Sequence, residues 1–340
     1  MRELIEVQRK LLPDLVEVLR NRYTLLQTIA HLQPIGRRAL SQVMNTTERI
    51  LRAEVDLLKE MGLLHVAPAG MSCSEEGMRI LEQLEPMADD LFGLNELASQ
   101  LQHYLQINRV VVVQGDSDQA EWVKQELGRM GARLLKQYVR EGDVIAVTGG
   151  STIASVSAHL TPSSAFRTVQ FVPARGGLGE KAELQANSLV SSMAAKTGAS
   201  YRLLHVPDRL PADALQTLKE EPQIMEVLSL LHSARIVLHG IGEAIKMAQR
   251  RRYDEEELAE LRELGAVSEA FGYYFNEAGE IVHRMETIGL QLEDVQNAEV
   301  VISIAGGASK AKAILSFAKQ SCQNVLITDE GAARAILGKE

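Results

Sequence analysis

The rhythm of hydrophobic and polar positions changes once along the chain, near residue 109. Before it, apolar residues recur every three or four positions, which is typical of amphipathic helices. After it, short apolar runs alternate with longer segments of helical spacing. Such alternation predicts an α/β domain with a doubly wound, Rossmann-like parallel sheet and helices on both faces. We therefore expect two domains, 1–90 and 91–340, as the length of 340 residues also suggests.

The spacing in the first domain predicts a helix–turn–helix. We expect a helix over 1–33 with a break near Pro13, a short helix over 35–43 and a turn at Met44-Asn45. Thr46 or Thr47 then caps a third helix that ends near Met61, before Gly62. This helix is expected to bury five apolar side chains: Ile50, Leu51, Val55, Leu57 and Leu58.

Two short segments, 63–66 and 71–74, flank Pro68-Ala69-Gly70 and predict a β-wing. Residues 78–105 are helical in pattern and rich in leucine and methionine, which predicts a linker helix. Its apolar stripe packs either on the body of the chain or on a second copy. The first domain is thus predicted to be a winged helix-turn-helix.

Charge is distributed unevenly along the chain. Residues 1–70 carry a net charge of +2, whereas the whole chain carries −9. A mildly basic head on an acidic body favours a protein that meets DNA through its head alone. Three short helices with a few arginines also occur in modules that do not bind DNA. The second helix of such a motif enters the major groove, and arginines near both helices meet phosphates. Six residues are therefore candidate DNA contacts: Arg37, Arg38, Thr47, Glu48, Arg49 and Arg52.

Composition narrows the class of protein. The hydrophobic fraction of 46% and charged fraction of 24% are those of a soluble globular protein. No run approaches the ~18 apolar residues of a membrane span, and no signal peptide is visible. Cys73 and Cys322 lie far apart, so we expect neither a metal site nor a disulfide framework, and a reducing cytoplasm fits.

The second domain is predicted to contain seven strands, at residues 110–113, 144–147, 169–172, 202–206, 236–238, 300–304 and 324–328. Ligands of parallel sheets bind beyond the carboxyl ends of the strands. The second strand runs into Gly149, Gly150, Ser151 and Thr152. Glycines allow close approach of the backbone, and the start of a helix favours an anion, so this turn is a candidate phosphate site. An ordinary capped strand-to-helix turn explains the same residues.

Two cations follow other glycine-rich strand ends. Arg175 stands among glycines after the third strand, and a planar cation beside flexible N–H donors suits a phosphate. Lys310 opens a helix after Ala305-Gly306-Gly307 and can reach a ligand oxygen. Both also resemble solvated surface cations. Taken together, the strand ends predict one polar crevice for an anionic metabolite. GxGxxG in its dinucleotide context and the Walker pattern are absent, which weakens a nucleotide-binding interpretation.

Further candidates follow from chemistry. The amide of Gln185 could bind a sugar hydroxyl, although surface glutamines are common. Arg250 and Arg251 belong to a basic run that either closes over a second phosphate or ends a helix in solvent. Glu269 could accept sugar hydroxyls, and the aromatic run after it is expected to pack a two-stranded excursion through Glu280.

A rival hypothesis is a sugar-phosphate isomerase or deaminase with an accessory head. Such chemistry needs a positioned base near the sugar carbons. Glu269, Asp116 and His239 are available, but no pair of them has a diagnostic spacing.

Long runs of the chain resemble the SorC-type transcriptional regulators, and the likeness covers essentially the whole length. It is carried by residues 33–38, 115–118, 147–150, 171–180, 239–244, 269–276 and 328–332. The likeness is strongest to members that control glycolytic genes in Gram-positive bacteria. In that family, a helix–turn–helix head precedes a domain similar in fold to sugar-phosphate isomerases and glucosamine-phosphate deaminases.

The resemblance implies a non-enzymatic repressor of a glycolytic operon, released by fructose 1,6-bisphosphate as its effector, with no resident cofactor. It places ligand contacts at ten positions: Gly149, Gly150, Ser151, Thr152, Arg175, Gln185, Arg250, Arg251, Glu269 and Lys310. Relatives are expected to carry threonine where this chain has Ser151, which keeps a hydroxyl. The head departs more, so the operator sequence stays open. We expect operator DNA, a sugar phosphate and further copies of the chain (a dimer, or a tetramer on DNA) as partners, and no membrane.

Overall fold

In the computed structural model the chain divides into two structural units. The first comprises residues 1–97 and 117–122, and the second comprises residues 98–116 and 123–340. The structure describes residues 11–44, 46–177, 181–208, 212–322 and 324–339. The expected helix before residue 11 and Asn45 of the expected turn therefore lie outside the described residues. None of the described helices is long and apolar enough to cross a membrane.

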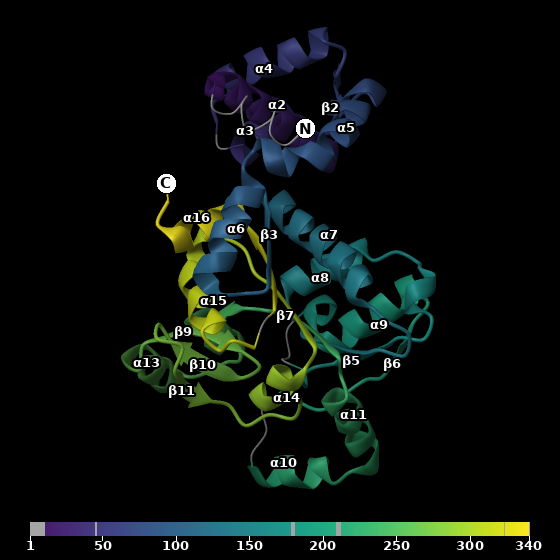
Figure 1. The fold of residues 1–340 in the computed structure, drawn as a ribbon, viewed down its shortest axis with the longest axis vertical. Helices are drawn as coiled ribbons and strands as arrows, with labels where there is room; N and C mark the ends of the chain where they lie inside the picture. Colours follow the sequence, from purple (N-terminus) through teal and green to yellow (C-terminus); the bar gives the residue numbers. More distant parts are fainter. Residues whose placement is uncertain (1–10, 45, 178–180, 209–211, 323, 340) are drawn as a thin grey trace. The chain divides into compact units, whose positions relative to one another are not determined.

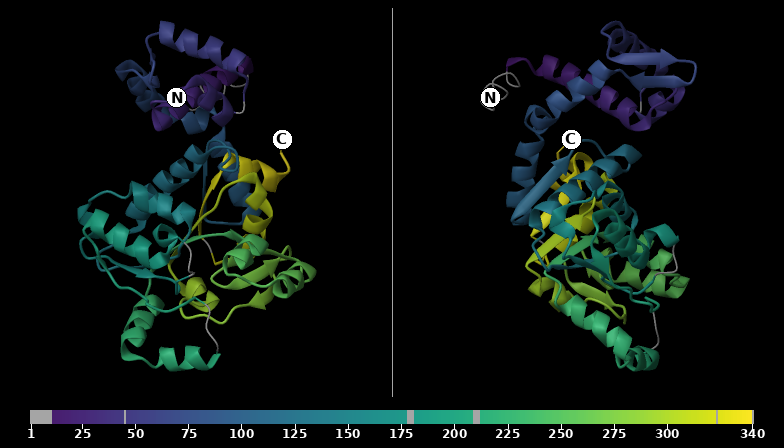
Figure 2. Two further views of the ribbon diagram at one scale, coloured as in Figure 1. Left: turned by 180° about the vertical axis from the view of Figure 1, so that it is seen from behind. Right: turned by 90° about the vertical axis from the view of Figure 1, so that its right-hand side faces the viewer.

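The first unit is a winged helix-turn-helix, as predicted. Its elements are α2 (Pro13–Leu32), α3 (Arg37–Val43), α4 (Glu48–Glu60), β1 (Leu64–Ala67), β2 (Gly70–Cys73) and α5 (Glu75–Leu91). Strands β1 and β2 pair antiparallel and form the wing, seen as two adjacent arrows in the right-hand view of Figure 2. The prediction of a single linker helix over 78–105 is wrong. It is broken at Phe92-Gly93, where Gly93 adopts a φ of +73°, and continues as α6 (Leu94–Leu105).

The first turn of α4 is fixed by its cap. The Thr47 hydroxyl accepts a hydrogen bond from the backbone N–H of Ile50 at 3.4 Å, and the helix ends at Glu60, before Gly62 with a φ of +75°. Leu51, Val55 and Leu58 form the buried stripe. The expectation that Ile50 is buried is wrong, because its side chain is 61% exposed. Successive helical residues point about 100° apart, so a stripe centred on Leu51 and Val55 turns Ile50 outward.

The second unit contains a seven-stranded parallel sheet in the order β3-β13-β12-β7-β4-β5-β6 (Figure 1). The strands are β3 (Arg109–Val113), β4 (Val144–Val147), β5 (Gln170–Pro173), β6 (Ser200–Tyr201), β7 (Ile236–Gly240), β12 (Val300–Ile304) and β13 (Val325–Asp329). The helices of this sheet include α7 (Glu121–Tyr138), α8 (Ser151–His159), α9 (Ala186–Thr197), α10 (Ala212–Lys219), α11 (Pro222–His232), α14 (Leu292–Asn297), α15 (Ala311–Ala318) and α16 (Glu330–Leu337). The strands are continuous apolar runs because helices cover both faces of the sheet.

The direction of the sheet order reverses between β4 and β7. The chain proceeds outward from β4 through β5 to β6, returns to β7 on the other side of β4, and proceeds outward again to β12 and β13. Crevices at such reversals are the usual ligand sites of open parallel sheets. Helix α8 leaves the end of β4 and packs on β7, so its first turn lies at this reversal.

A second, antiparallel sheet follows β7. It has four strands in the order β11-β10-β9-β8, namely β8 (Gly242–Glu243), β9 (Ala266–Ala270), β10 (Tyr273–Asn276) and β11 (Ile281–Arg284). The expected two-stranded excursion is therefore too small. Helices α12 (Ala244–Arg250) and α13 (Glu255–Glu263) connect β8 to β9, and α12 and α15 pack on β9.

The predicted strand at 202–206 is also wrong, because only Ser200 and Tyr201 pair with the sheet. The Asn187 side chain bonds both the N–H and the carbonyl of Leu204 at 2.9 Å, and the Val206 carbonyl accepts from Gly177 N at 2.9 Å. These bonds satisfy the backbone without a neighbouring strand. Leu204 and Val206 are apolar because they are buried, not because they lie in the sheet.

Candidate functional site

One pocket opens at the reversal of the sheet, and every ligand residue expected from the sequence lines it. It holds about 840 Å³ of empty space, part of it open to solvent. The lining includes Gly149, Gly150, Ser151, Thr152, Arg175, Gln185, Arg250, Arg251, Glu269 and Lys310. The glycine-rich strand ends therefore meet in one place.

The end of β4 and the first turn of α8 form one wall. Gly150 is the N-cap of α8 with a φ of +114°, a conformation that a side chain would strain. A Cβ on Gly149 would lie 2.6 Å from the carbonyl oxygen of Leu184, so only glycine fits there. The first N–H groups of a helix have no acceptor within it, and here they share the wall with the Ser151 and Thr152 hydroxyls. This wall has the chemistry of an anion site.

Two further cations line the pocket from other elements. Arg250 is exposed at the end of α12, where its Nη1 contacts the Met247 sulfur at 3.8 Å. Lys310, at the end of the short 3-10 helix η3 (Ala308–Lys310), donates from Nζ to the Ile241 carbonyl at 3.3 Å. Gln185 is the N-cap residue of α9 rather than a residue within the helix. The pocket thus offers positive charge from several separate elements.

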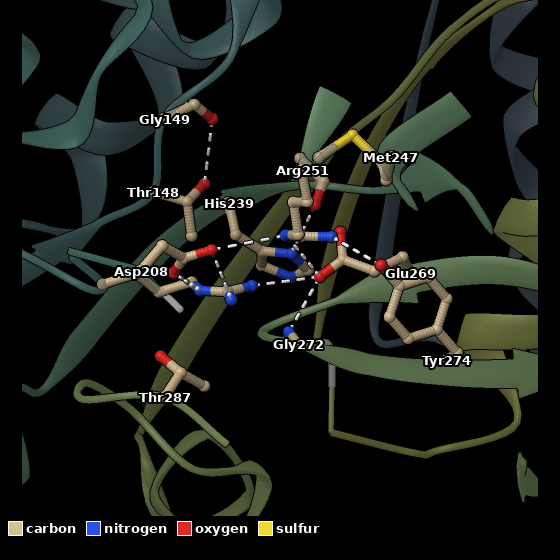
Figure 3. Close-up of polar contacts among 12 residues, drawn as sticks. Thr148, Gly149, Asp208, His239, Met247, Arg251, Glu269, Gly272, Tyr274 and Thr287 are labelled. Atoms are coloured by element: carbon tan, nitrogen blue, oxygen red, sulfur yellow. Dashed lines mark hydrogen bonds and ion pairs between the residues drawn. The ribbon is translucent and has the colours of Figure 1, made fainter. Parts of the chain in front are cut away.

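Two buried arginines and two buried carboxylates form an ion-pair network at the pocket. Arg175 donates from Nε and Nη2 to the two oxygens of Asp208, both at 2.9 Å, and from Nη1 to Glu269 Oε1 at 3.0 Å. Arg251 donates to the same Oε1 at 2.8 Å, to Asp208 at 3.3 Å and to the Tyr274 hydroxyl at 3.1 Å. Figure 3 shows Asp208, Arg251 and Glu269 pointing toward one another. We call these four residues the buried quartet.

The quartet compensates its own charge. Arg175 and Arg251 are 7% and 8% exposed, and Asp208 and Glu269 are 3% and 4% exposed. Burial alone would raise the pKa of the Glu269 carboxyl, but Arg251, Arg175 and the Gly272 N–H outweigh it, so the pKa lies below its usual value. Glu269 is therefore ionised and weakly basic. Most N–H donors of Arg175 already bond carboxylates. A direct contact of Arg175 with a phosphate therefore stays a prediction.

Asp208 is the member of the quartet that sequence reasoning missed. It follows Pro207 in an irregular segment, with no motif around it. The available signal was indirect: two arginines expected at one buried site require counter-charges.

Only one of the three candidate bases lines the pocket. Glu269 lines the pocket, whereas neither Asp116 nor His239 is part of its lining. His239 is fully buried, with Nε2 at 2.7 Å from the Ser303 hydroxyl and Nδ1 at 3.0 Å from the Gly240 carbonyl. Burial lowers its pKa to about 4, so its imidazole is neutral near pH 7. No group of His, Cys, Asp and Glu that could hold a metal occurs among the described residues.

The candidate DNA contacts lie on and before α4. Arg38, Thr47, Glu48, Arg49 and Arg52 are exposed. Arg37 is half-buried, and its Nη2 donates to Asp56 at 3.1 Å. Thr47 caps the helix, so its hydroxyl has a structural role. The structure thus leaves four charged side chains of the helix-turn-helix exposed, and their contact with DNA stays a prediction.

Comparison with known proteins matches both halves of the chain. Residues 89–338 match the family model of a sugar-binding domain, and residues 18–88 match that of the CggR N-terminal DNA binding domain. The chain is 48% identical to the central glycolytic genes regulator of Priestia megaterium, over 99% of both chains. It is 45% identical to the regulator of the same name from Bacillus subtilis, over the full length of both.

Solved structures agree. A SorC family transcriptional regulator from Enterococcus faecalis is 42% identical and covers 71% of this chain and 99% of its own, with a TM-score of 0.67. The full-length sorbitol operon regulator SorC from Klebsiella pneumoniae, 20% identical, shares the fold over 93% of this chain and 99% of its own, with a TM-score of 0.66. The chain therefore belongs to the SorC family of transcriptional regulators, within the group of the central glycolytic genes regulators.

Proposed function

We propose that this chain represses a glycolytic operon and that fructose 1,6-bisphosphate, bound in the pocket, releases it from the operator. The observation that carries the proposal is the meeting of a helix N-terminus, two hydroxyls and two partly accessible cations in one pocket. A bisphosphate carries about four negative charges near neutrality. A site for such a ligand needs positive potential at two places, and the helix N-terminus of α8 and the cations Arg250 and Lys310, which come from separate elements, support the proposal.

The ligand is proposed to bridge the pocket. One phosphate lies on the first turn of α8, at Ser151 and Thr152, and the other lies near Arg250. Lys310 adds a further positive charge to the pocket. Gln185 and Glu269 are proposed to bind the sugar hydroxyls. Only Oε1 of Glu269 accepts bonds from the residues that the structure describes, which leaves Oε2 for a hydroxyl.

We propose that the pocket binds without turnover. A general base works best with a pKa near the working pH. The pKa of Glu269 is held below its usual value by two arginines, and His239 lies outside the lining with a pKa of about 4. Neither group suits proton abstraction from a sugar. Relatives named as transcription regulators point the same way.

Release follows from differential affinity. A ligand shifts an equilibrium only if it binds one arrangement of the protein better than another. We propose that the bridged arrangement changes the spacing of paired DNA-binding units in an oligomer, and half-sites about 34 Å apart tolerate little change. DNA and glycolytic intermediates meet in the cytoplasm, so the proposal places the protein there.

The test is a titration of operator binding. Labelled DNA from upstream of a glycolytic operon is bound to the full chain and followed by fluorescence anisotropy while fructose 1,6-bisphosphate is added. We expect the Kd for DNA to rise at least about tenfold, since coupling energies of ~1–3 kcal/mol are usual. Fructose 6-phosphate, with one phosphate, should have a smaller effect. A bisphosphate that binds with measurable heat but leaves DNA affinity unchanged would refute repression relief while leaving the site intact.

A further inference from the structure

An exposed isoleucine lies on the helix expected to enter the major groove. Ile50 is the third residue of α4 and is 61% exposed, although its neighbour Leu51 is 3% exposed. The Thr47 cap bonds its backbone N–H, so the first turn that carries it is well defined. Isoleucine is branched at Cβ and has one strongly preferred rotamer in a helix. The side chain is therefore a stiff apolar projection that loses little entropy on contact.

Its surroundings indicate DNA rather than a second copy of the chain. At about 100° per residue, Arg49, Ile50 and Ala53 lie on one face, away from the buried stripe of Leu51, Val55 and Leu58. Arg49 and Ala53 are exposed as well, and exposed Arg52 lies on the next face. Two copies facing each other through this surface would bring arginines together, whereas DNA supplies phosphates. The small side chain of Ala53 lets the helix approach the groove closely.

The chemistry of the major groove narrows the contact. Its base edges present donors and acceptors, and the apolar group among them is the C5-methyl of thymine. The first turn of the second helix in a helix–turn–helix is the part that reaches these edges. A single exposed isoleucine needs no explanation elsewhere on a surface, but this one stands on the turn that reaches base edges in proteins of this fold.

We propose that Ile50 is a specificity-determining residue that packs on the methyl group of one thymine in each operator half-site. Arg49 and Arg52 contact phosphates beside it and carry no sequence preference. The inference rests on the DNA-binding role of the first unit. It is independent of the effector and of the pocket.

The test removes the methyl group from the DNA. The full chain selects its preferred duplex from a random pool, and each thymine of that duplex is then replaced singly by deoxyuridine. We expect one position per half-site at which the replacement weakens wild-type binding about fivefold, the value of one buried methyl group. Ile50→Ala removes the contact from every bound copy, so it should weaken binding to the thymine duplex by about this factor for each half-site, and it should be indifferent to deoxyuridine at that position.

Two variants separate this contact from general effects. Met61→Ala changes a side chain that is 55% exposed just past the end of α4, and it should bind like wild type. Arg49→Ala should reduce the salt dependence of binding by about one unit of slope, whereas Ile50→Ala, which removes no charge, should keep the slope.

Three outcomes would overturn the proposal. One is unchanged DNA binding by a folded Ile50→Ala. Another is an equal deoxyuridine effect in wild type and Ile50→Ala, which assigns the methyl to another residue. The third is altered association of copies by Ile50→Ala with the thymine preference retained, which assigns Ile50 to a protein contact. Because the side chain is exposed, Ile50→Ala should unfold at the same urea concentration as wild type.

Discussion

At the scale of single residues, His239 is a fully buried, neutral imidazole packed between aromatic rings, with a polar contact at each ring nitrogen. Its ring centroid lies 4.7 Å from that of Phe271 and 5.2 Å from that of Phe317. Its pKa is lowered by burial from 6.5 to about 4 in the folded chain. Between these values the unfolded chain binds a proton that the folded chain does not. The contribution of His239 to the free energy of unfolding is therefore complete above about pH 6.5 and is lost as the pH falls toward 4.

We predict that His239→Gln reduces this pH dependence. Wild type should lose about 3 kcal/mol of unfolding free energy through His239 between pH 6.5 and 4. The variant lacks that contribution, so its stability should fall less over the same range, although it is lower at pH 7. Urea unfolding at several pH values measures both slopes. The exposed His103→Gln serves as the control with a wild-type slope, and equal slopes in wild type and His239→Gln would contradict the assignment.

Asp208 holds both arginines of the buried quartet. Removing its charge leaves Arg175 and Arg251 with one carboxylate between them, and a buried charge without its partner is costly. We predict that Asp208→Asn lowers the unfolding free energy by about 3 kcal/mol. Asp213→Asn, which changes an exposed carboxylate at the start of α10, should have almost no effect. Equal stability of the two variants would mean that the quartet contributes little.

At the scale of elements, α8 allows ligand binding to be tested apart from folding. Its first turn faces the pocket, and its other end does not line it. We predict that Ser151→Ala and Thr152→Ala each weaken binding of fructose 1,6-bisphosphate about tenfold, since each removes a hydrogen bond to a charged group. Calorimetric titration measures the change.

The control for this pair is Thr161→Ala, an exposed residue just past the end of α8. It should bind the bisphosphate like wild type, and all three variants should unfold like wild type. Wild-type affinity in both Ser151→Ala and Thr152→Ala would place the phosphate elsewhere.

Local patterns predicted most elements, because local physics determines them. Apolar runs of four or five residues gave the long strands, and the glycines with Ser151 and Thr152 gave one wall of the pocket. Asp208 could not be found in this way, since its partners Arg175 and Arg251 are 33 and 43 residues away. Ile50 was expected in the core because it is apolar and adjoins Leu51, although a helical stripe centred on Leu51 and Val55 turns its side chain outward. The strand expected at 202–206 failed because burial alone produced its apolar pattern.

At the scale of the whole molecule, the proposed function couples DNA binding by the first unit to ligand binding by the second. The first unit has the form of a winged helix-turn-helix, and the second holds a pocket at the reversal of its sheet. Linkage between the two binding equilibria is what the proposed function requires, and linkage is reciprocal.

The most direct test measures this reciprocity. The Kd for fructose 1,6-bisphosphate is determined by calorimetry on the full chain, once free and once saturated with operator DNA. The account predicts that bound DNA weakens the bisphosphate by the same factor, at least about tenfold, by which the bisphosphate weakens DNA. Identical bisphosphate affinity with and without DNA would contradict it.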